Sequence, residues 1–213
     1  MALSFRQLTP HFAAEVGPVD LRQVHDAATL AEIRAGMDRY AVLVFHDQPF
    51  TDPEHLDFAQ RLDGVLHTKL GISALQKNTD ASFQDPPGRY SMLSAKVVPP
   101  VDADTEYADM RAAYDALPAE MKERLEGPRV HHSIAHSRQT LGFEFSENEA
   151  EALKGAVHPL VRTIPRSGRR SLYVASHASR IIDWPVPEGR LLLRDLIEHA
   201  TQPQFVYRPP WRV

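Results

Sequence analysis

Apolar residues recur at helical spacing in several parts of the chain. Residues 27–40 place Leu30, Ile33 and Met37 on one face, which predicts an amphipathic helix. Capping residues, proline in a first turn or a following glycine indicate more helices, which cover residues 51–64, 106–117, 118–126, 146–154 and 188–200. The last of these should turn inward the apolar side chains Leu191, Leu192, Leu196 and Ile197.

Short runs rich in β-branched or aromatic residues predict strands between these helices. They cover residues 41–45, 90–98, 130–137, 160–164 and 171–175, and a further strand begins at Gln204. A turn signal at residues 165–168 joins two of them into a hairpin. Because strands and helices do not alternate regularly, we expect an α+β fold with a β-sandwich or jelly-roll core.

The composition is that of an ordinary globular protein of 213 residues, with 43% hydrophobic and 24% charged residues. A single domain is expected at this length. The net charge of -4 gives no indication of nucleic-acid binding. The lack of cysteine excludes disulfides, thiolate metal sites and a cysteine nucleophile. The 17 prolines favour a β-rich fold with many turns, and the 11 histidines are candidate ligands for iron or zinc.

No targeting or membrane signal is found in the sequence. Residues 1–9 lack the apolar core of a signal peptide. No apolar run approaches the roughly 20 residues that a spanning helix needs. We therefore expect a cytoplasmic location and no membrane partner.

Five stretches, in one order across nearly the whole chain, resemble a single enzyme family. They are residues 41–62, 79–95, 98–118, 158–174 and 196–208. Through them the chain resembles the taurine/2,4-dichlorophenoxyacetate (TauD/TfdA) family of iron(II)- and 2-oxoglutarate-dependent dioxygenases. Residues 89–93 and 110–118 resemble the herbicide-cleaving branch more than the taurine branch.

This resemblance implies a fold and a chemistry. The fold is a double-stranded β-helix, a relative of the jelly roll, with flanking helices. Iron(II) is held by two histidines and one carboxylate, which leaves coordination positions for 2-oxoglutarate and O2. The resemblance also implies a small carboxylate or sulfonate substrate and a homo-oligomer.

The metal-binding motif of the family, His-x-Asp, falls on Asn78, Thr79 and Asp80. The resemblance makes Asp80 the carboxylate ligand of the iron and a catalytic residue. From spacing alone, a solvated or capping aspartate in a loop is the favoured interpretation of Asp80, and the resemblance of the surrounding residues reverses this preference. Asn78 occupies the place of the first histidine ligand, and asparagine is a poorer iron ligand.

Thr105 matches the threonine that binds the 2-oxoglutarate carboxylate in the family. Taken alone, Thr105 is also a good N-cap for the helix expected from residue 106, and the two roles can coexist. The Gly-Gly pair that usually precedes this position is replaced by Asp102 and Ala103.

The family has further residues for which this sequence offers no match. Its second histidine ligand and the arginine that pairs with 2-oxoglutarate lie beyond a Trp-Asp-Asn strand, which would follow Trp211. The resemblance also implies a segment between Asn78 and Thr79 that this sequence lacks. One interpretation is that the sequence is the ordered part of a longer chain, and the other is a truncated, inactive relative. We favour the first, because a jelly roll without its last strands would expose unpaired edges.

Two residues are candidates for binding the substrate. Lys69 matches a lysine of the herbicide branch that could bind a substrate carboxylate, although a solvated loop lysine would look the same. His132 falls near the substrate pocket of the family. On one strand it would share a face with His136, while His131 would face away. For this pattern, ordinary partly buried or surface histidines are favoured over a metal site. A structural role is favoured for His177, and His158 shows no ligand spacing.

The leading hypothesis is therefore oxidative cleavage of an aryloxyalkanoate or a similar small carboxylate, with iron(II) and 2-oxoglutarate. Hydroxylation next to the ether oxygen would give an unstable hemiacetal, which separates into a phenol and an oxo-acid. A sulfonate dioxygenase is the alternative of the same class. A catalytically inactive relative that only binds a small acid or a partner is the alternative of another class.

Overall fold

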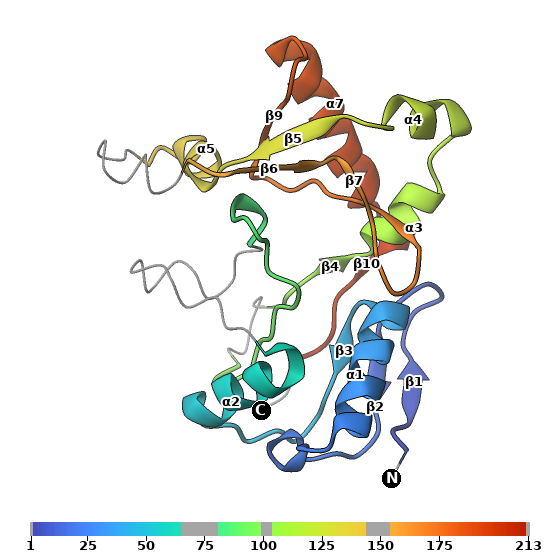
Figure 1. The fold of residues 1–213 in the computed structure, drawn as a ribbon, viewed down its shortest axis with the longest axis vertical. Coiled ribbons are helices and arrows are strands. Elements are labelled where there is room, and N and C mark those ends of the chain that lie inside the picture. Colours follow the sequence, from blue (N-terminus) through green and yellow to red (C-terminus); the bar gives the residue numbers. More distant parts are fainter. Residues whose placement is uncertain (1, 65–80, 99–103, 144–153, 212–213) are drawn as a thin grey trace. The chain divides into compact units, whose positions relative to one another are not determined.

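The computed structural model describes residues 2–64, 81–98, 104–143 and 154–211 of the chain (Figure 1). The chain forms two compact units. Unit 1 comprises Met1–Gln76, Met92–Asp109 and Val206–Val213, and unit 2 comprises Lys77–Ser91 and Met110–Phe205. Each unit contains both helices and strands, so an α+β class is confirmed.

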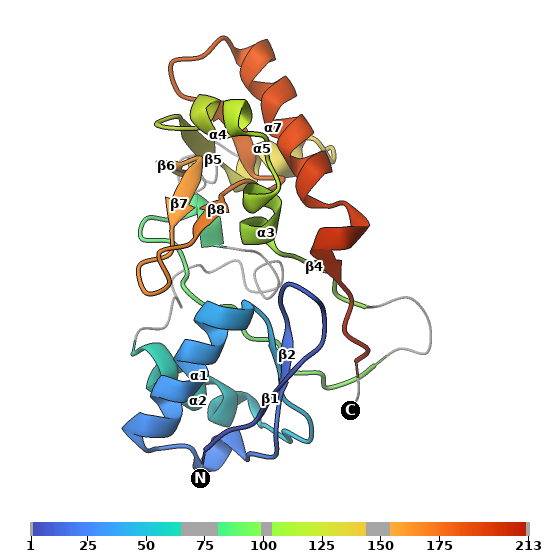
Figure 2. The same ribbon diagram turned by 90° about the vertical axis from the view of Figure 1, so that its right-hand side faces the viewer.

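A three-stranded sheet and two helices build most of unit 1. Strand β1 (Phe5–Gln7) pairs antiparallel with β2 (Ala14–Val16), which pairs in parallel with β3 (Leu43–Val44). Helix α1 (Ala27–Tyr40) begins at Asp26, whose carboxylate accepts from the Thr29 N–H. The helix lies along this sheet (Figure 2), and the Phe5 and Tyr40 rings stack with centroids 5.8 Å apart.

Helix α2 (Asp52–Asp63) begins with the capping signal that the sequence predicts. The Thr51 hydroxyl accepts from the Glu54 N–H, and the Glu54 carboxylate accepts from the Thr51 N–H in return. The short helix η1 (Leu21–Gln23) lies against α2.

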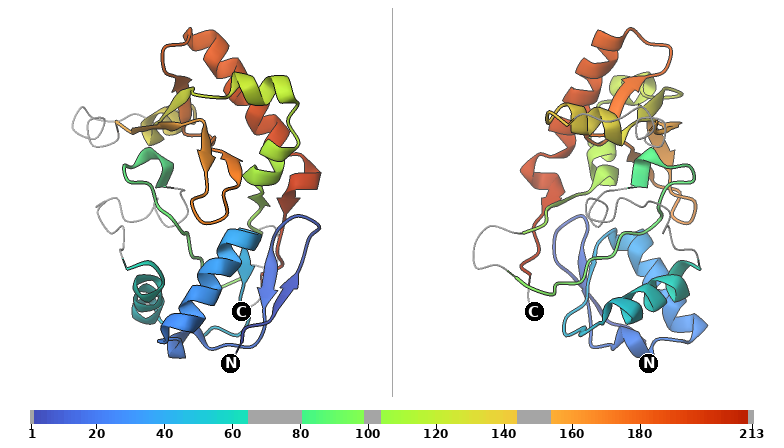
Figure 3. Two further views of the ribbon diagram at one scale, coloured as in Figure 1. Left: turned by 45° about the vertical axis from the view of Figure 1, so that its right-hand side comes forward. Right: turned by 90° about the vertical axis from the view of Figure 1, so that its left-hand side faces the viewer.

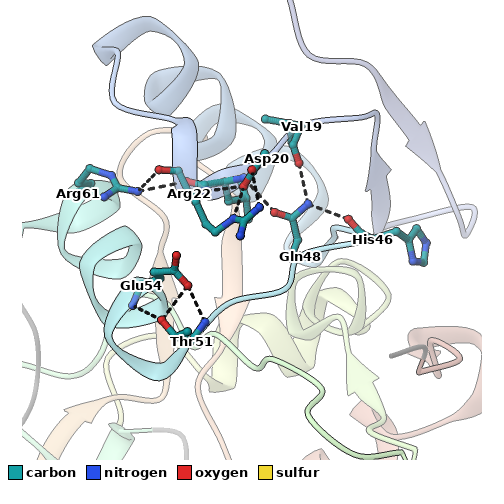
Figure 4. A network of polar contacts seen from close by, with 9 residues as sticks. Val19, Asp20, Arg22, His46, Gln48, Thr51, Glu54 and Arg61 are labelled. Carbon is teal, nitrogen blue, oxygen red and sulfur yellow. Dashed lines mark hydrogen bonds and ion pairs between the residues drawn. The ribbon is translucent and has the colours of Figure 1, made fainter.

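Polar side chains bind the backbone around η1 (Figure 4). The Gln48 amide donates to the carbonyls of Val19 and His46, at 2.6 and 2.7 Å, and its oxygen accepts from the Leu21 N–H. Arg61 donates to the Leu21 carbonyl at 3.2 Å. The bond to Gln48 satisfies the Leu21 N–H, which has no partner inside the short helix, and the other bonds connect the backbone on either side of it.

A second, smaller sheet completes unit 1. Strand β4 (Tyr107–Ala108) pairs antiparallel with β10 (Val206–Tyr207). The Tyr207 ring lies edge-on to Phe12, with centroids 6.3 Å apart. Residues about 100 positions apart in the sequence therefore meet at this sheet.

Unit 2 contains a three-stranded sheet, a hairpin and several helices (Figure 3). The sheet order is β6 (Ala156–Pro159), β5 (Arg129–His132) and β9 (Ala178–Ile181), all antiparallel. Strands β7 (Val161–Thr163) and β8 (Arg170–Leu172) form the hairpin. The helices are η2 (Ala81–Phe83), α3 (Met110–Asp115), α4 (Ala119–Arg124), α5 (Ile134–Gln139), α7 (Val186–Ala200) and η3 (Pro203–Phe205).

Helix α7 supplies much of the apolar core of unit 2. Leu192, Leu193 and Leu196 are at most 4% exposed and pack with Ile181 of β9. The predicted inward position of Leu191 is wrong, because this side chain is 62% exposed. The buried stripe is rotated by one residue from the predicted one.

Several predicted elements are confirmed and others are wrong. Helix 27–40, helix 51–64, the hairpin and the long helix near the C-terminal end are confirmed. Residues 90–98 form no strand, and the helix expected over residues 106–117 is replaced by β4 and the shorter α3. The strand expected over residues 130–137 ends at His132 and gives way to α5. The helix expected over residues 146–154 lies mostly outside the described residues.

Within the described part of the chain, no helix is both long enough and apolar enough to cross a bilayer.

Candidate functional site

The four residues assigned from the sequence fall in different parts of the molecule. Asp80 and Lys69, together with Asn78, lie outside the described residues. Thr105 belongs to unit 1 and His132 to unit 2. The surroundings of Thr105 and those of His132 therefore belong to different units.

Thr105 is partly buried and precedes strand β4. It is not a helix N-cap, because the next helix begins only at Met110. Its Oγ1 accepts a hydrogen bond of 3.3 Å from the Trp211 indole N–H. Asp104 and Arg208 form an ion pair of 2.8 Å beside it. The sequence had suggested the cap, and the structure replaces it with contacts to the end of the chain that follows β10.

The Thr105 hydroxyl can still donate a hydrogen bond. An indole N–H can only donate, so the hydroxyl oxygen accepts this bond and keeps its own proton. Within the described residues, no acceptor for that proton is found. This arrangement fits a threonine that donates to a carboxylate, as the 2-oxoglutarate role requires. Burial raises the pKa of the nearby Tyr107 phenol, so that group is neutral at pH 7.

His132 is fully buried, with 0% of its surface exposed. Its Nδ1 lies 3.1 Å from the Ser82 hydroxyl. Its ring packs against the rings of His158 and Tyr173, with centroids 5.7 and 5.2 Å away. These contacts come from β6, from the residue that follows β8 and from η2, and they place His132 inside unit 2.

The β5–β6 register explains how two histidines meet. Val130 is paired with His158, and His132 with Ala156. Side chains alternate between the faces of a strand, so His132 and His158 are diagonal neighbours on one face. His131 points the other way and binds the Ser179 hydroxyl at 2.8 Å.

The predicted pairing of His132 with His136 on one strand is wrong. His136 lies on α5, after the strand has ended, and Ser133 caps that helix. Burial lowers the pKa of His136, and the positive charge of Arg190 lowers it further. The sequence pattern suggested a shared strand face because it does not show where the strand stops.

Metal-binding side chains are not grouped within the described residues. No cluster of three or more histidine, aspartate or glutamate side chains is found there that could hold a metal ion. Carboxylate and imidazole groups suit iron(II), and Asp80, the one assigned ligand of this kind, lies outside the described ranges. The carboxylate of Asp80 is a suitable ligand for iron(II). Its position relative to the metal stays a prediction.

Sequence reasoning missed the residues that surround His132. His158 shows no ligand spacing, Tyr173 has no predicted role, and Ser82 is identified only as part of the family stretch that follows Asp80. The sequence carries no local signal that places the two histidines on one face, which becomes visible only in the alternating burial of residues 129–132 and 156–159.

Comparisons with known proteins identify relatives over the full chain. The family described as "Taurine catabolism dioxygenase TauD, TfdA family" matches residues 4–213. An alpha-ketoglutarate-dependent 2,4-dichlorophenoxyacetate dioxygenase of Cupriavidus pinatubonensis is 40% identical over 250 aligned positions, which cover 100% of this chain and 87% of that protein. A (S)-phenoxypropionate/alpha-ketoglutarate-dioxygenase of Sphingobium herbicidovorans is 31% identical, covering 99% and 83%.

Solved structures give the same relationship. The crystal structure of AAD-2 in complex with Mn(II) and N-oxalylglycine matches with a TM-score of 0.92 and 46% identity, covering 100% of this chain and 85% of that one. A taurine dioxygenase from Burkholderia xenovorans matches less closely, with a TM-score of 0.72 and 25% identity over 99% and 76%. The similarity is therefore greater to the AAD-2 structure than to this taurine dioxygenase.

Proposed function

Because the chain belongs to the TauD/TfdA dioxygenase family, we propose that it is an iron(II)- and 2-oxoglutarate-dependent dioxygenase that cleaves an aryloxyalkanoate. The observation that carries this proposal is the 40% identity to a 2,4-dichlorophenoxyacetate dioxygenase over the whole of this chain. The AAD-2 complex supports the cofactors, because N-oxalylglycine is 2-oxoglutarate with a methylene group replaced by N–H. The lower identity to the taurine enzyme makes a sulfonate substrate the less favoured alternative.

The reaction is balanced by the cosubstrates. One oxygen atom of O2 enters the carbon next to the ether oxygen, and the other enters succinate as 2-oxoglutarate loses CO2. When bound, iron(II) would supply the site at which O2 is activated. The hydroxylated ether is a hemiacetal, which breaks at its C–O bond to release a phenol and an oxo-acid.

The protein residues take separate roles in this proposal. Asp80 supplies the carboxylate ligand of the iron. Thr105 donates its hydroxyl proton to 2-oxoglutarate, supported by the indole bond that leaves this proton available. Lys69 binds the substrate carboxylate by charge. His132 is predicted to face the substrate, and its complete burial gives it an additional role in holding the chain.

We also propose how this chain relates to the family fold. The double-stranded β-helix is supported by the solved relatives. The alignment needs 250 positions for the 213 residues of this chain, which supports an absent internal segment. Its place between Asn78 and Thr79 stays a prediction. A single domain, a homo-oligomer and a cytoplasmic location stay predictions.

The proposed function is tested by product release. The protein is incubated with iron(II), ascorbate, 2-oxoglutarate and 2,4-dichlorophenoxyacetate, and both dichlorophenol and succinate are measured. We expect equal amounts of the two products, with neither formed when iron or 2-oxoglutarate is omitted. The matched variant Asp80→Asn should form neither. A protein that binds the substrate but releases no phenol would favour the inactive relative. Succinate that forms when taurine replaces 2,4-dichlorophenoxyacetate, but not with 2,4-dichlorophenoxyacetate itself, would favour the sulfonate enzyme.

A further inference from the structure

Three consecutive residues of η2 and its exit each contact a different buried histidine. They are Ser82, Phe83 and Gln84, which follow Asp80 at a distance of two to four positions. Figure 1 shows this turn next to strands β5 and β6, against which it packs. The segment directly after the proposed iron ligand is therefore held by unit 2.

The first contact joins Ser82 to His132. The Ser82 hydroxyl and the His132 Nδ1 are 3.1 Å apart, and both side chains are at most 2% exposed. A hydrogen bond between enclosed groups is not replaced by water when it breaks, so its loss is costly. This bond fixes the side chain two positions after Asp80.

The second contact joins Phe83 to His177. Their rings lie edge to face, with centroids 5.7 Å apart and an angle of 83°. His177 is itself fixed, because its Nδ1 lies 2.9 Å from the Ser137 hydroxyl. That hydroxyl donates to the Ile134 carbonyl, so it accepts from His177.

The third contact joins the backbone of Gln84 to His158. The His158 Nε2 lies 3.0 Å from the Gln84 carbonyl oxygen. A carbonyl only accepts, so this nitrogen carries a proton and donates. His158 is 6% exposed and His177 is 7% exposed, so all three histidines are buried.

We propose that His132, His158 and His177 form a histidine cradle, which holds residues 82–84 in place and thereby restricts the chain that directly follows Asp80. The proposal rests on the proposed function, because it assigns the cradle to the residue that would bind iron. It separates two roles for His132: a substrate-facing residue would change the KM for the aryloxyalkanoate, whereas a positioning residue would change metal affinity. Groups that orient a metal ligand typically contribute about 10- to 100-fold to metal affinity.

The test uses Ser82→Ala, which removes one hydroxyl and leaves every histidine in place. Ser82→Thr is the matched control, because it keeps the hydroxyl. Mn(II) affinity is measured from the signal of free Mn(II) in electron paramagnetic resonance, and hydrogen exchange is measured for peptides that cover residues 82–91. Thermal unfolding of each variant shows that it is folded.

We expect Ser82→Ala to bind Mn(II) about 10- to 100-fold more weakly and to exchange faster over residues 82–84, with both properties restored in Ser82→Thr. The KM for the aryloxyalkanoate in fully metal-loaded protein should stay within about twofold, in line with the outer-shell role. A changed KM with unchanged Mn(II) affinity would overturn the cradle and support a substrate role for His132.

A second pair of variants covers the case in which the serine change is too mild. His158→Gln keeps an N–H donor near the position of Nε2, and His158→Leu removes it. The glutamine variant should bind Mn(II) more tightly than the leucine variant, and equal affinities would count against the cradle. A parent protein that is well protected over residues 82–84 but binds no Mn(II) would refute the proposed function, whereas a parent that binds Mn(II) with those residues unprotected would refute the cradle.

Discussion

Thr105 in unit 1 and Ser82 in unit 2 are both hydroxyl side chains beside an aromatic ring nitrogen, but their surroundings differ. Ser82 is 2% exposed, and its partner His132 is enclosed among other rings. Thr105 is partly open, next to the exposed ion pair of Asp104 and Arg208. We expect the enclosed Ser82 hydroxyl to hold the chain in place, and the more open Thr105 hydroxyl to donate a hydrogen bond to a ligand. Burial therefore separates a positioning group from a binding group.

The largest effect is expected where unit 2 is most enclosed. Leu196 on α7 is 2% exposed, and Leu191 on the same helix is 62% exposed. Leu196→Ala should lower the free energy of unfolding by about 2–5 kcal/mol, because it leaves a cavity in the core. Leu191→Ala should change it by no more than about 0.5 kcal/mol. Urea unfolding checks both, and equal losses would show that the enclosed face is assigned wrongly.

The second-largest loss of stability is expected from a substitution at Gly155, whose backbone lies next to that of His132. Gly155 has φ +86°, and a Cβ there would lie 2.0 Å from the His132 carbonyl oxygen. Gly127 has a similar φ of +89°, with nothing within 4 Å of a Cβ. Gly155→Ala should therefore cost about 2–4 kcal/mol, from strain and overlap together. The control Gly127→Ala should cost only about 1–2 kcal/mol, from the backbone conformation.

These two glycine variants also test the cradle from its backbone side. In Gly155→Ala the His132 backbone must shift, so exchange over residues 82–84 should increase. Gly127→Ala should leave that exchange unchanged. If both variants lost the same free energy of unfolding, the overlap between the new Cβ and the His132 carbonyl oxygen would have no measurable effect on stability.

The open hydroxyl gives a smaller and more specific effect. Thr105→Val removes a hydrogen bond to a carboxylate, which corresponds to a roughly 10- to 100-fold higher KM for 2-oxoglutarate. Thr105→Ser keeps the hydroxyl and should stay close to the parent. Initial rates of succinate formation at varied 2-oxoglutarate give both values. The same KM for the valine and serine variants would remove Thr105 from the cosubstrate site.

How far the sequence predicts this structure depends on whether a signal is local. Helices α1 and α2 are predicted well because their signals are local: the spacing of Leu30, Ile33 and Met37 for α1, and a cap at Thr51 or Asp52 followed by a proline for α2. The helix expected from residue 106 fails because Tyr107 pairs with Tyr207, a partner 100 positions away. No local pattern reveals such a pairing.

The candidate site divides in the same way. Thr105 and Asp80 are identified by their place in a family motif. The contact between His132 and His158 depends on the register of β5 and β6, and the contact with Ser82 depends on where η2 packs. Neither follows from spacing along the chain, so the cradle required the three-dimensional structure.

The smallest effect concerns His55, a histidine on helix α2 of unit 1. Burial lowers the pKa of His55 from its ordinary value of 6.5, and the charge of Lys96 lowers it further. Well above pH 6.5 neither the folded nor the unfolded chain protonates this ring, so it costs no stability. As the pH falls from 6.5 to the lower folded pKa, the unfolded chain binds the proton preferentially and stability decreases. An NMR titration of the His55 ring should give a midpoint below 6.5, and a midpoint above it would contradict the buried environment.

The central claim is that this chain holds iron(II) and 2-oxoglutarate together at a site that includes Asp80. The most direct measurement is an anaerobic titration of the protein and of Asp80→Asn with iron(II) in the presence of 2-oxoglutarate. The parent should develop a weak visible charge-transfer band that saturates at one iron per chain, and the variant should develop none. A parent without this band at saturating iron and 2-oxoglutarate, or a variant with the same band, would contradict the claim.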